Sequence, residues 1–187
     1  MLISYSHRFI FIHVYKTAGK SIREALKKYA QKSPEFGGHI TANELSQELP
    51  SDVYDNFFKF AFVRNPWDLQ VSLYSFMLQN KRHRQHELIK SMANFDEYLD
   101  WRVTKDMNLQ SDFIVNSNGN VIVDFVGKFE NLRSDFSHIS ETIGIKAKLS
   151  HLNKSRHKDY RRYYTQRTID LVNDKFLNDI DLFDYSF

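Results

Sequence analysis

The sequence predicts an α/β fold, with a mainly parallel central sheet flanked by helices. Two observations indicate this fold class. Apolar segments of strand length alternate with segments whose apolar residues recur at helical spacing. Two of the strand-like segments also end in polar, loop-forming residues that lead directly into a helical pattern. Because the chain has no internal repeat and no linker rich in Pro, Gly or Ser, we expect a single domain over residues 1–187.

The first part of the chain predicts two buried strands, each identified by an unbroken apolar run. They are residues 8–15 and residues 58–63. Between them, residues 20–29 place apolar side chains on one helical face. Thr41 and Glu44 then form a capping-box pattern, which predicts the start of a short helix.

The rest of the chain predicts more helix than strand. Asn and Gly at residues 116–120 indicate a hairpin turn, and residues 126–129 indicate a further strand. Apolar side chains at helical spacing predict helices over residues 66–78, 95–102, 132–143 and 165–180.

Composition excludes several classes of protein. With 42% hydrophobic and 26% charged residues, the chain is globular, and a formal charge of +3 is too small to indicate a nucleic-acid partner. The absence of cysteine excludes disulfides and thiolate metal sites. No apolar run is long enough to span a bilayer, and no signal-peptide pattern follows Met1. We therefore expect a cytoplasmic protein.

A candidate anion site follows the first strand, at the predicted turn into a helix. Small residues let backbone N–H groups approach an anion, the helix N-terminus adds partial positive charge, and lysines neutralise the remainder. A plain turn with solvated lysines is the alternative interpretation. The residues of this segment are Lys16, Thr17, Ala18, Gly19, Lys20 and Ser21.

The end of this segment is similar to the Walker A motif of nucleotide-binding P-loops. That motif requires a glycine five positions before Gly19, where this chain has Val14. A strand ending in a Mg²⁺-binding aspartate is also only weakly indicated, at residues 121–124. The sequence therefore disfavours an ATP-dependent P-loop enzyme.

A second candidate anion site follows the second strand. Arg64 lies at the strand end, Pro66 starts a helix, and Ser72 lies about two helical turns further on. Parallel strands have their carboxyl ends at one edge of a sheet, so the two candidate sites are expected to be neighbours. The alternative interpretation is that Arg64 pairs with Asp68 and that Ser72 is merely a surface residue.

Together the two segments resemble those of sulfotransferases that use 3′-phosphoadenosine 5′-phosphosulfate (PAPS). The resemblance is strongest to the carbohydrate branch, which includes the heparan 2-O- and chondroitin enzymes. Its motifs match this chain at residues 13–21, 62–68 and 71–74, and the similarity continues through residues 123–132 and 152–155.

This resemblance implies a three-layer, P-loop-like α/β fold, with PAPS as the sulfuryl donor and no requirement for a metal. It assigns the 5′-phosphosulfate to residues 16–21 and the 3′-phosphate to Arg64 and Ser72. Tyr15 stands where the family usually has proline, and Lys20 where it usually has threonine. Further cofactor contacts are implied for Phe129, Asn153 and Ser155.

The expected reaction is an in-line displacement, in which negative charge develops on the leaving phosphate oxygen. Lys16 is expected to neutralise that charge. The acceptor hydroxyl needs a base, and a histidine is suited to this role near neutral pH. His39 is the candidate, because it precedes the capped helix and because the 2-O branch has a histidine in a similar Gly-His context. The alternatives to His39 are Glu44, His151 and His157, whereas His13 is expected to be structural.

The sequence thus predicts a sulfotransferase that acts on a hydroxyl of a saccharide or glycoconjugate, with Lys16 and His39 as catalytic residues. Basic residues at 81–86 are consistent with an anionic acceptor, although such a stretch is also typical of a solvated loop. Two other functions are considered, an ATP-dependent P-loop kinase and a non-catalytic protein that binds polyanionic saccharides. The sequence does not predict an oligomeric state.

Overall fold

The computed structural model describes residues 1–31, 39–149 and 157–187. Their contacts divide the chain into two compact units. The sheet unit comprises Met1–Arg64 and Gln110–Asn153, and the helical unit comprises Asn65–Leu109 and Lys154–Phe187. That residues 1–187 act as a single domain stays a prediction.

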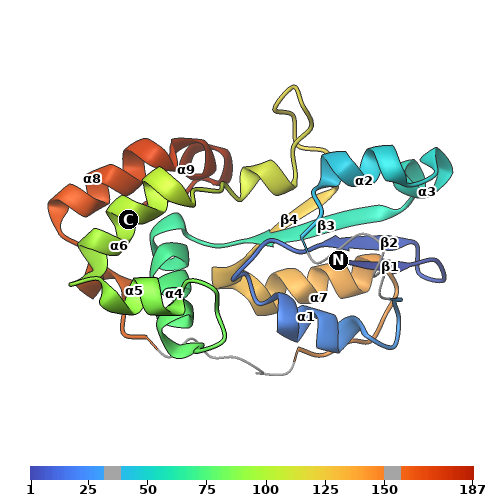
Figure 1. The fold of residues 1–187 in the computed structure, drawn as a ribbon. Coiled ribbons are helices and arrows are strands. Elements are labelled where there is room, and N and C mark those ends of the chain that lie inside the picture. Colours follow the sequence, from blue (N-terminus) through green and yellow to red (C-terminus); the bar gives the residue numbers. More distant parts are fainter. Residues whose placement is uncertain (32–38, 150–156) are drawn as a thin grey trace. The chain divides into compact units, whose positions relative to one another are not determined.

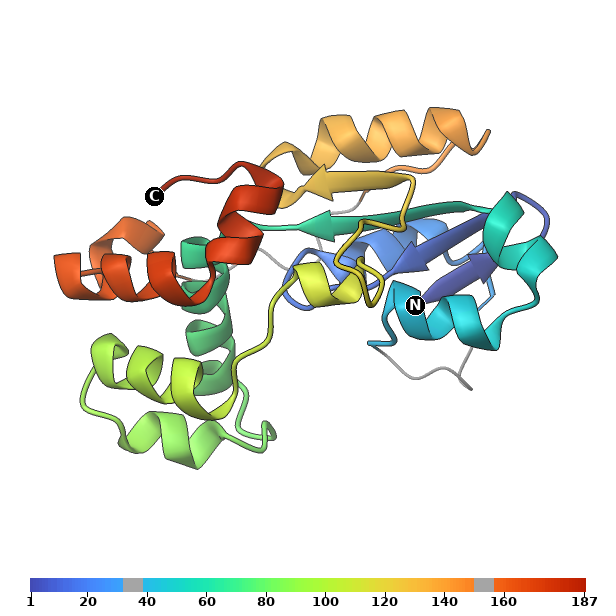
Figure 2. The same ribbon diagram turned by 90° about the horizontal axis from the view of Figure 1, so that it is seen from above.

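The sheet unit contains a four-stranded sheet in the order β1-β2-β3-β4, and Figures 1 and 2 show these strands side by side. Strands β2, β3 and β4 are parallel, and β1 runs antiparallel to β2. In the register, Phe60 lies opposite both Phe11 and Phe125. The predicted mixed α/β fold with a mainly parallel sheet is therefore confirmed. The strand bounds are β1 (Leu2–Ser4), β2 (Phe9–Ile12), β3 (Phe58–Val63) and β4 (Phe125–Lys128).

Two strand predictions need correction. The first predicted strand, residues 8–15, is shorter in the structure, because the chain leaves the sheet after Ile12 and enters a loop with left-handed backbone at Lys16 and Ala18. The predicted turn at 116–120 is present, with Gly119 at φ 79°, but only the single bridge between Val115 and Val121 joins its flanks. Strand β1 was not predicted, because three residues are too few to establish a pattern.

Helices cover both faces of the sheet unit. Figure 1 shows α1 and α7 on one face and α2 and α3 on the opposite side. The predicted capping box is present at the start of α2, where Thr41 and Glu44 each bond to the other's backbone N–H. A second short helix, α3, starts after Pro50 and was not predicted. The helical elements of this unit are α1 (Gly19–Leu26), α2 (Ala42–Glu48), α3 (Ser51–Asn56), η2 (Ser111–Phe113), η3 (Phe129–Asn131) and α7 (Leu132–Thr142).

The core between the sheet and helices α1 and α7 is rich in phenylalanine. The rings of Phe11 and Phe60 are stacked with their centroids 5.3 Å apart. Burying one such side chain contributes about 1.5–3 kcal/mol relative to leaving it exposed. This core fixes the carboxyl ends of β2 and β3. Its buried members from these elements are Leu2, Phe9, Phe11, Ile22, Ala25, Leu26, Phe60, Phe62, Phe136 and Ile139.

The helical unit is built from capped helices. Asn65 accepts hydrogen bonds from the backbone N–H groups of Trp67 and Asp68, which starts α4 at Pro66 as predicted. Thr165 caps α8 through a second capping box. None of the helices in the described ranges is long and apolar enough to cross a membrane. The elements are α4 (Pro66–Gln79), α5 (His86–Ser91), α6 (Phe95–Lys105), η4 (Tyr160–Tyr163), α8 (Gln166–Lys175) and α9 (Leu177–Phe183).

Candidate active site

The loop that joins β2 to α1 has the geometry of an anion-binding turn. Lys16 and Ala18 have φ values of 62° and 65°, and Ala18 is the N-cap of α1. Left-handed residues next to right-handed ones turn successive backbone N–H groups towards one side, where they can bind an anion. The hydroxyl of the buried Thr17 donates to the carbonyl of Val14 at 2.8 Å, so it shapes the loop.

Gly19 is required by the packing of the loop against His13. A Cβ atom on Gly19 would lie 1.9 Å from His13 Nε2, which is an impossible contact unless the ring moves. Ser21 follows in the first turn of α1 and is 8% exposed. The small residues of this segment therefore serve the close packing of the loop as well as access to its backbone.

Three cations are close enough to influence one another at this loop. The pKa of Lys16 is lowered to about 8, first by burial and then by the positive charges of Arg64 and Lys20. Lys20 itself is exposed. Such a concentration of positive charge is unfavourable by itself and is relieved when an anion binds.

Arg64 lies at the carboxyl end of β3 and is only 3% exposed. Its Nη1 donates to the carbonyl oxygen of Lys16 at 3.3 Å, and its guanidinium carbon lies 4.1 Å from the centroid of the Phe129 ring. The contact with Phe129 is a cation–π interaction. The structure thus brings together residues that the sequence assigned to the cofactor from three separate segments.

Gln110 holds the backbone of Arg64 and was missed by the sequence analysis. Its Oε1 accepts from the N–H of Arg64 at 2.8 Å, and its Nε2 donates to the carbonyl of Arg64, also at 2.8 Å. The Gln110 side chain is fully buried. No sequence signal marks a glutamine in this role, because it depends on the meeting of two segments 46 positions apart.

His39 and His13 form a stacked pair beside the loop. Their ring centroids are 4.7 Å apart, and His39 Nδ1 lies 3.0 Å from the carbonyl oxygen of His13. Because a carbonyl can only accept, Nδ1 carries the proton. In the neutral ring Nε2 is then unprotonated and can accept a proton, as a base must. The side chain of His39 is exposed.

The alternative base Glu44 is poorly suited to the role. Its carboxylate accepts from both the N–H and the hydroxyl of Thr41, at 2.7 and 2.8 Å. These bonds lower the pKa of Glu44 and make it a weaker base. His157 lies in the helical unit, where its Nε2 is 3.8 Å from Asp68 Oδ1.

The other predicted site residues lie in the helical unit or outside the described ranges. Ser72 lies on α4 and is 3% exposed, so it is not the surface residue of the alternative interpretation. Asn153 and Ser155 lie outside the described residues, as does His151, one of the alternative candidates for the base.

Asp124 is wrongly placed to be the Mg²⁺ ligand of a P-loop enzyme. It precedes β4, whereas the anion loop follows β2, and these two strands run in the same direction as β3. Asp124 therefore lies at the amino ends of the parallel strands, and the loop lies at their carboxyl ends. The Asp124 carboxylate also accepts from the backbone N–H of Lys59 at 2.7 Å and pairs with Lys59 Nζ at 2.9 Å. Within the described ranges, no group of His, Asp and Glu residues is arranged to hold a metal.

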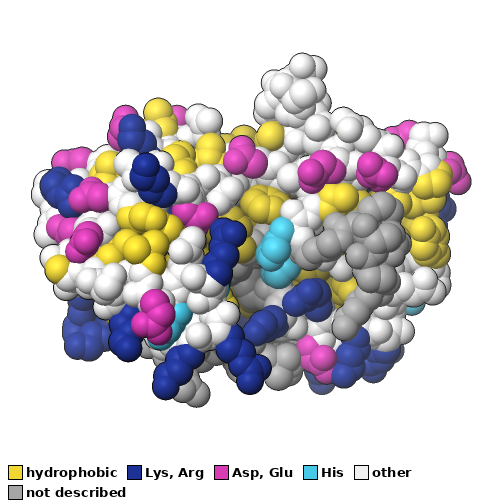
Figure 3. Space-filling model, viewed as in Figure 1, with side chains coloured by type: hydrophobic (Ala, Val, Ile, Leu, Met, Phe, Trp, Pro, Cys, Tyr) yellow, Lys and Arg dark blue, Asp and Glu magenta, His cyan; other side chains and the backbone are white. Residues whose placement is uncertain are grey.

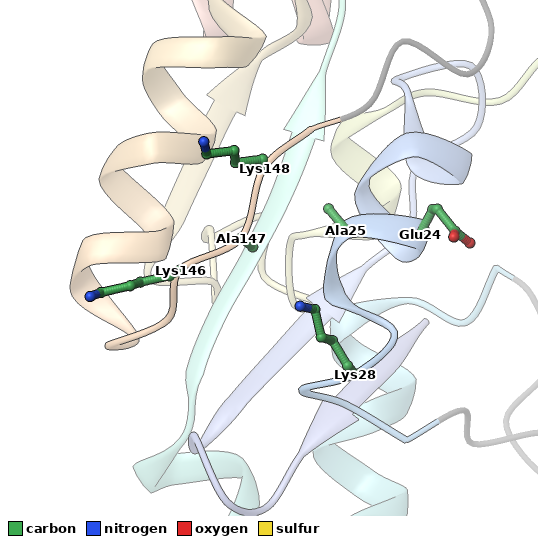
Figure 4. A pocket seen from close by; sticks show the side chains of 6 residues that line it. All are labelled: Glu24, Ala25, Lys28, Lys146, Ala147 and Lys148. Atoms are coloured by element: carbon green, nitrogen blue, oxygen red, sulfur yellow. The ribbon is translucent and has the colours of Figure 1, made fainter.

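A separate pocket of about 370 Å³ lies beside the other end of α1. In Figure 4 the ammonium groups of its lysines do not converge on one point, so it lacks the geometry of a phosphate site. It contains none of the predicted site residues. Its lining residues are Glu24, Ala25, Lys28, Lys146, Ala147 and Lys148.

Comparison with known proteins gives the family. The family model described as "Sulfotransferase family" matches residues 1–186. An uncharacterized protein of Archaeoglobus fulgidus is 29% identical in an alignment of 119 residues, which covers 59% of this chain and 88% of that protein. The fold is similar to the crystal structure of mouse sulfotransferase SULT7A1 complexed with PAP, with a TM-score of 0.62 and 14% identity over 97% of this chain and 87% of that one.

The chain therefore belongs to the sulfotransferase family, since the family model spans nearly all of its length. This confirms the enzyme class that the two motifs predict, a PAPS-dependent sulfotransferase. It also agrees with the P-loop-like fold, which the structural neighbour shares.

Proposed function

We propose that this enzyme transfers a sulfuryl group from PAPS to a hydroxyl of a saccharide or glycoconjugate, with His39 as the base. The observation that carries the proposal is the meeting of Lys16, Lys20 and Arg64 at a loop of anion-binding conformation. When bound, PAPS supplies a sulfuryl group whose bond to the phosphate oxygen breaks as the acceptor oxygen attacks. Side chains of the protein are proposed to bind the donor, to stabilise the charge on the leaving oxygen and to take the proton from the acceptor.

The residues present fit the two anionic ends of this donor. The loop at residues 16–21 offers backbone N–H groups and two lysines, which suits the 5′-phosphosulfate. Arg64 offers a buried guanidinium for the 3′-phosphate, and Phe129 beside it offers a ring face for a base. Contributions from Ser72, Asn153 and Ser155 are proposed from the sequence alone.

Lys16 is proposed to stabilise the developing charge on the leaving oxygen. It extends from the head of the loop, and its ammonium is partly desolvated, so its charge acts more strongly than it would in water. No metal is needed for this role, because cations of the chain already surround the site.

His39 is proposed to take the proton from the acceptor hydroxyl. Its Nδ1–H is held by the carbonyl of His13, which leaves Nε2 as the basic nitrogen. The stack with the His13 ring fixes the orientation of the imidazole. The ring is therefore positioned beside the anion loop, as a base for this reaction has to be.

The proposal is tested by transfer of labelled sulfate from PAPS to a saccharide panel, with EDTA present. Lys16→Ala should lower turnover about 10²- to 10³-fold, and Lys28→Ala, which removes an exposed lysine near the other end of α1, should not. His39→Ala should lower turnover about 10²- to 10⁴-fold while PAP still binds. His7→Ala is its matched control, because His7 packs on Tyr29 away from the loop.

Two outcomes would contradict the proposal. Full turnover in His39→Ala would remove His39 as the base. Binding of a sulfated saccharide without any transfer from PAPS would instead favour a non-catalytic saccharide-binding protein.

A further inference from the structure

Four aromatic side chains form a continuous row beside the anion loop, which we call the aromatic row. The His13 and His39 rings are stacked, and the Phe113 ring meets His39 edge-on, with centroids 6.3 Å apart at 74°. The Tyr15 ring in turn meets Phe113 with centroids 5.9 Å apart at 67°. All four residues belong to the sheet unit.

The aromatic row is anchored to the same elements as the donor site. Tyr15 immediately precedes Lys16 in the loop. Phe113 ends the short helix η2, in which its N–H donates to the carbonyl of Gln110 at 3.2 Å. Since the Gln110 side chain is bonded to Arg64, the position of Phe113 is fixed relative to the end of β3.

The row is accessible to a ligand beside the proposed base. His39 is exposed, and Tyr15 and Phe113 are partly exposed. Figure 3 shows that hydrophobic, Lys or Arg, and histidine side chains all reach the surface on the face displayed. An acceptor whose hydroxyl reaches His39 Nε2 therefore has apolar ring surface available for the rest of the molecule.

We propose that Tyr15 and Phe113 determine acceptor specificity, and that the acceptor is a pyranoside whose C–H face packs against these rings. The proposal rests on the proposed function. The Tyr15 and Phe113 rings are in edge-on contact, and both are partly exposed. Because the acceptor of the proposed function is a saccharide, the apolar C–H face of a chair-shaped sugar is the part that can pack on this ring surface, while its hydroxyls stay at the rim.

The experiment compares Tyr15→Leu, Phe113→Leu and Phe113→Tyr with the wild type. The acceptors are methyl pyranosides, the alditols with the same hydroxyl pattern, and simple phenols. Tyr5→Leu is the matched control, because Tyr5 is also an exposed tyrosine packed on a phenylalanine, Phe57, but lies at the amino edge of the parallel strands. PAP affinity is measured for every variant.

Methyl pyranosides should be sulfated at least about tenfold more efficiently than alditols or phenols in the wild type. Tyr15→Leu and Phe113→Leu should each raise the KM for the pyranoside about three- to tenfold, with kcat and PAP affinity nearly unchanged. Tyr5→Leu should behave like the wild type, and Phe113→Tyr, which keeps the ring, should raise the KM less than Phe113→Leu does.

Equal use of alditols, or a preference for phenols, would overturn the proposed acceptor class. An unchanged KM in both leucine variants would overturn the role of the two rings. PAP binding without transfer to any pyranoside would also overturn the acceptor class, whereas failure to bind PAP at all would count against the proposed function itself.

Discussion

At the scale of single residues, Lys16 connects the electrostatics of the free enzyme with donor binding. Its pKa is lowered to about 8 because burial and the charges of Arg64 and Lys20 disfavour its protonated form. A bound polyanion has the opposite effect and favours protonation. Binding of PAP above about pH 8 should therefore be accompanied by uptake of a proton.

The affinity for PAP should decrease as the pH rises through about 8, by up to about tenfold per pH unit. Calorimetric titrations at about pH 7, 8 and 9 in buffers of different ionisation enthalpy measure both the affinity and the proton uptake. Lys16→Arg, which stays charged over this range, should remove the pH dependence. A wild-type affinity that is flat across the range would contradict the assignment.

The lowered pKa of Lys16 also makes the stability of the free protein depend on pH. In the unfolded chain Lys16 titrates near its ordinary value, 10.5, and in the folded chain near 8. Between these two values the unfolded chain holds the extra proton, so this residue makes the free energy of unfolding increase as the pH rises. Below about pH 8 both states are protonated, and the cost of the buried charge is fully present.

At the scale of elements, the end of β3 is fixed by a side chain from another segment. Gln110 bonds the N–H and the carbonyl of Arg64, and it immediately precedes η2. This arrangement holds Arg64 at the strand end, where its side chain reaches the carbonyl of Lys16 and the ring of Phe129. Gln110 is thus a positioning residue, which acts through Arg64.

Gln110→Leu should destabilise the protein by about 1–3 kcal/mol, because it removes both hydrogen bonds that the Gln110 side chain makes with the backbone of the buried Arg64. The variant should also weaken PAP binding, while kcat at saturating PAPS changes little. Urea denaturation and PAP titration measure the two effects. Gln110→Glu keeps an acceptor for the Arg64 N–H but loses the donor, so its stability and its PAP affinity should lie between those of the wild type and Gln110→Leu. If Gln110→Leu loses stability but binds PAP as the wild type does, Gln110 has only a structural role.

At the scale of the whole molecule, the sulfotransferase family model spans both compact units. The anion loop, residues 16–21, belongs to the sheet unit alone. A ligand that binds the folded chain shifts the unfolding equilibrium by mass action. The identity of the stabilising nucleotide therefore distinguishes a sulfotransferase from a kinase.

PAP without metal should stabilise the folded protein by about 2.7 kcal/mol at about 100 times its Kd, a Tm increase of about 5–10 °C. Mg²⁺ with ATP should give a much smaller shift, because Asp124, the weak candidate for the metal ligand of a kinase, is bonded to Lys59 at the opposite ends of the parallel strands from the anion loop. Differential scanning calorimetry measures both shifts. A larger shift with Mg²⁺ and ATP would favour the kinase alternative.

The sequence by itself determined the strands that carry the site, the starts of the main helices and the enzyme class. These features depend on local pattern: an unbroken apolar run for β3, a capping box at Thr41, and an Asn-Pro start for α4. Each is set by neighbours within a few positions along the chain.

Only the tertiary structure decided which side chains meet. The bonds from Gln110 to Arg64, the stack of His13 on His39 and the contact of Tyr15 with Phe113 all join segments far apart in the sequence. It also showed that Asp124 precedes its strand and is paired with Lys59. Such contacts follow from strand order and register, which no local pattern of residues encodes.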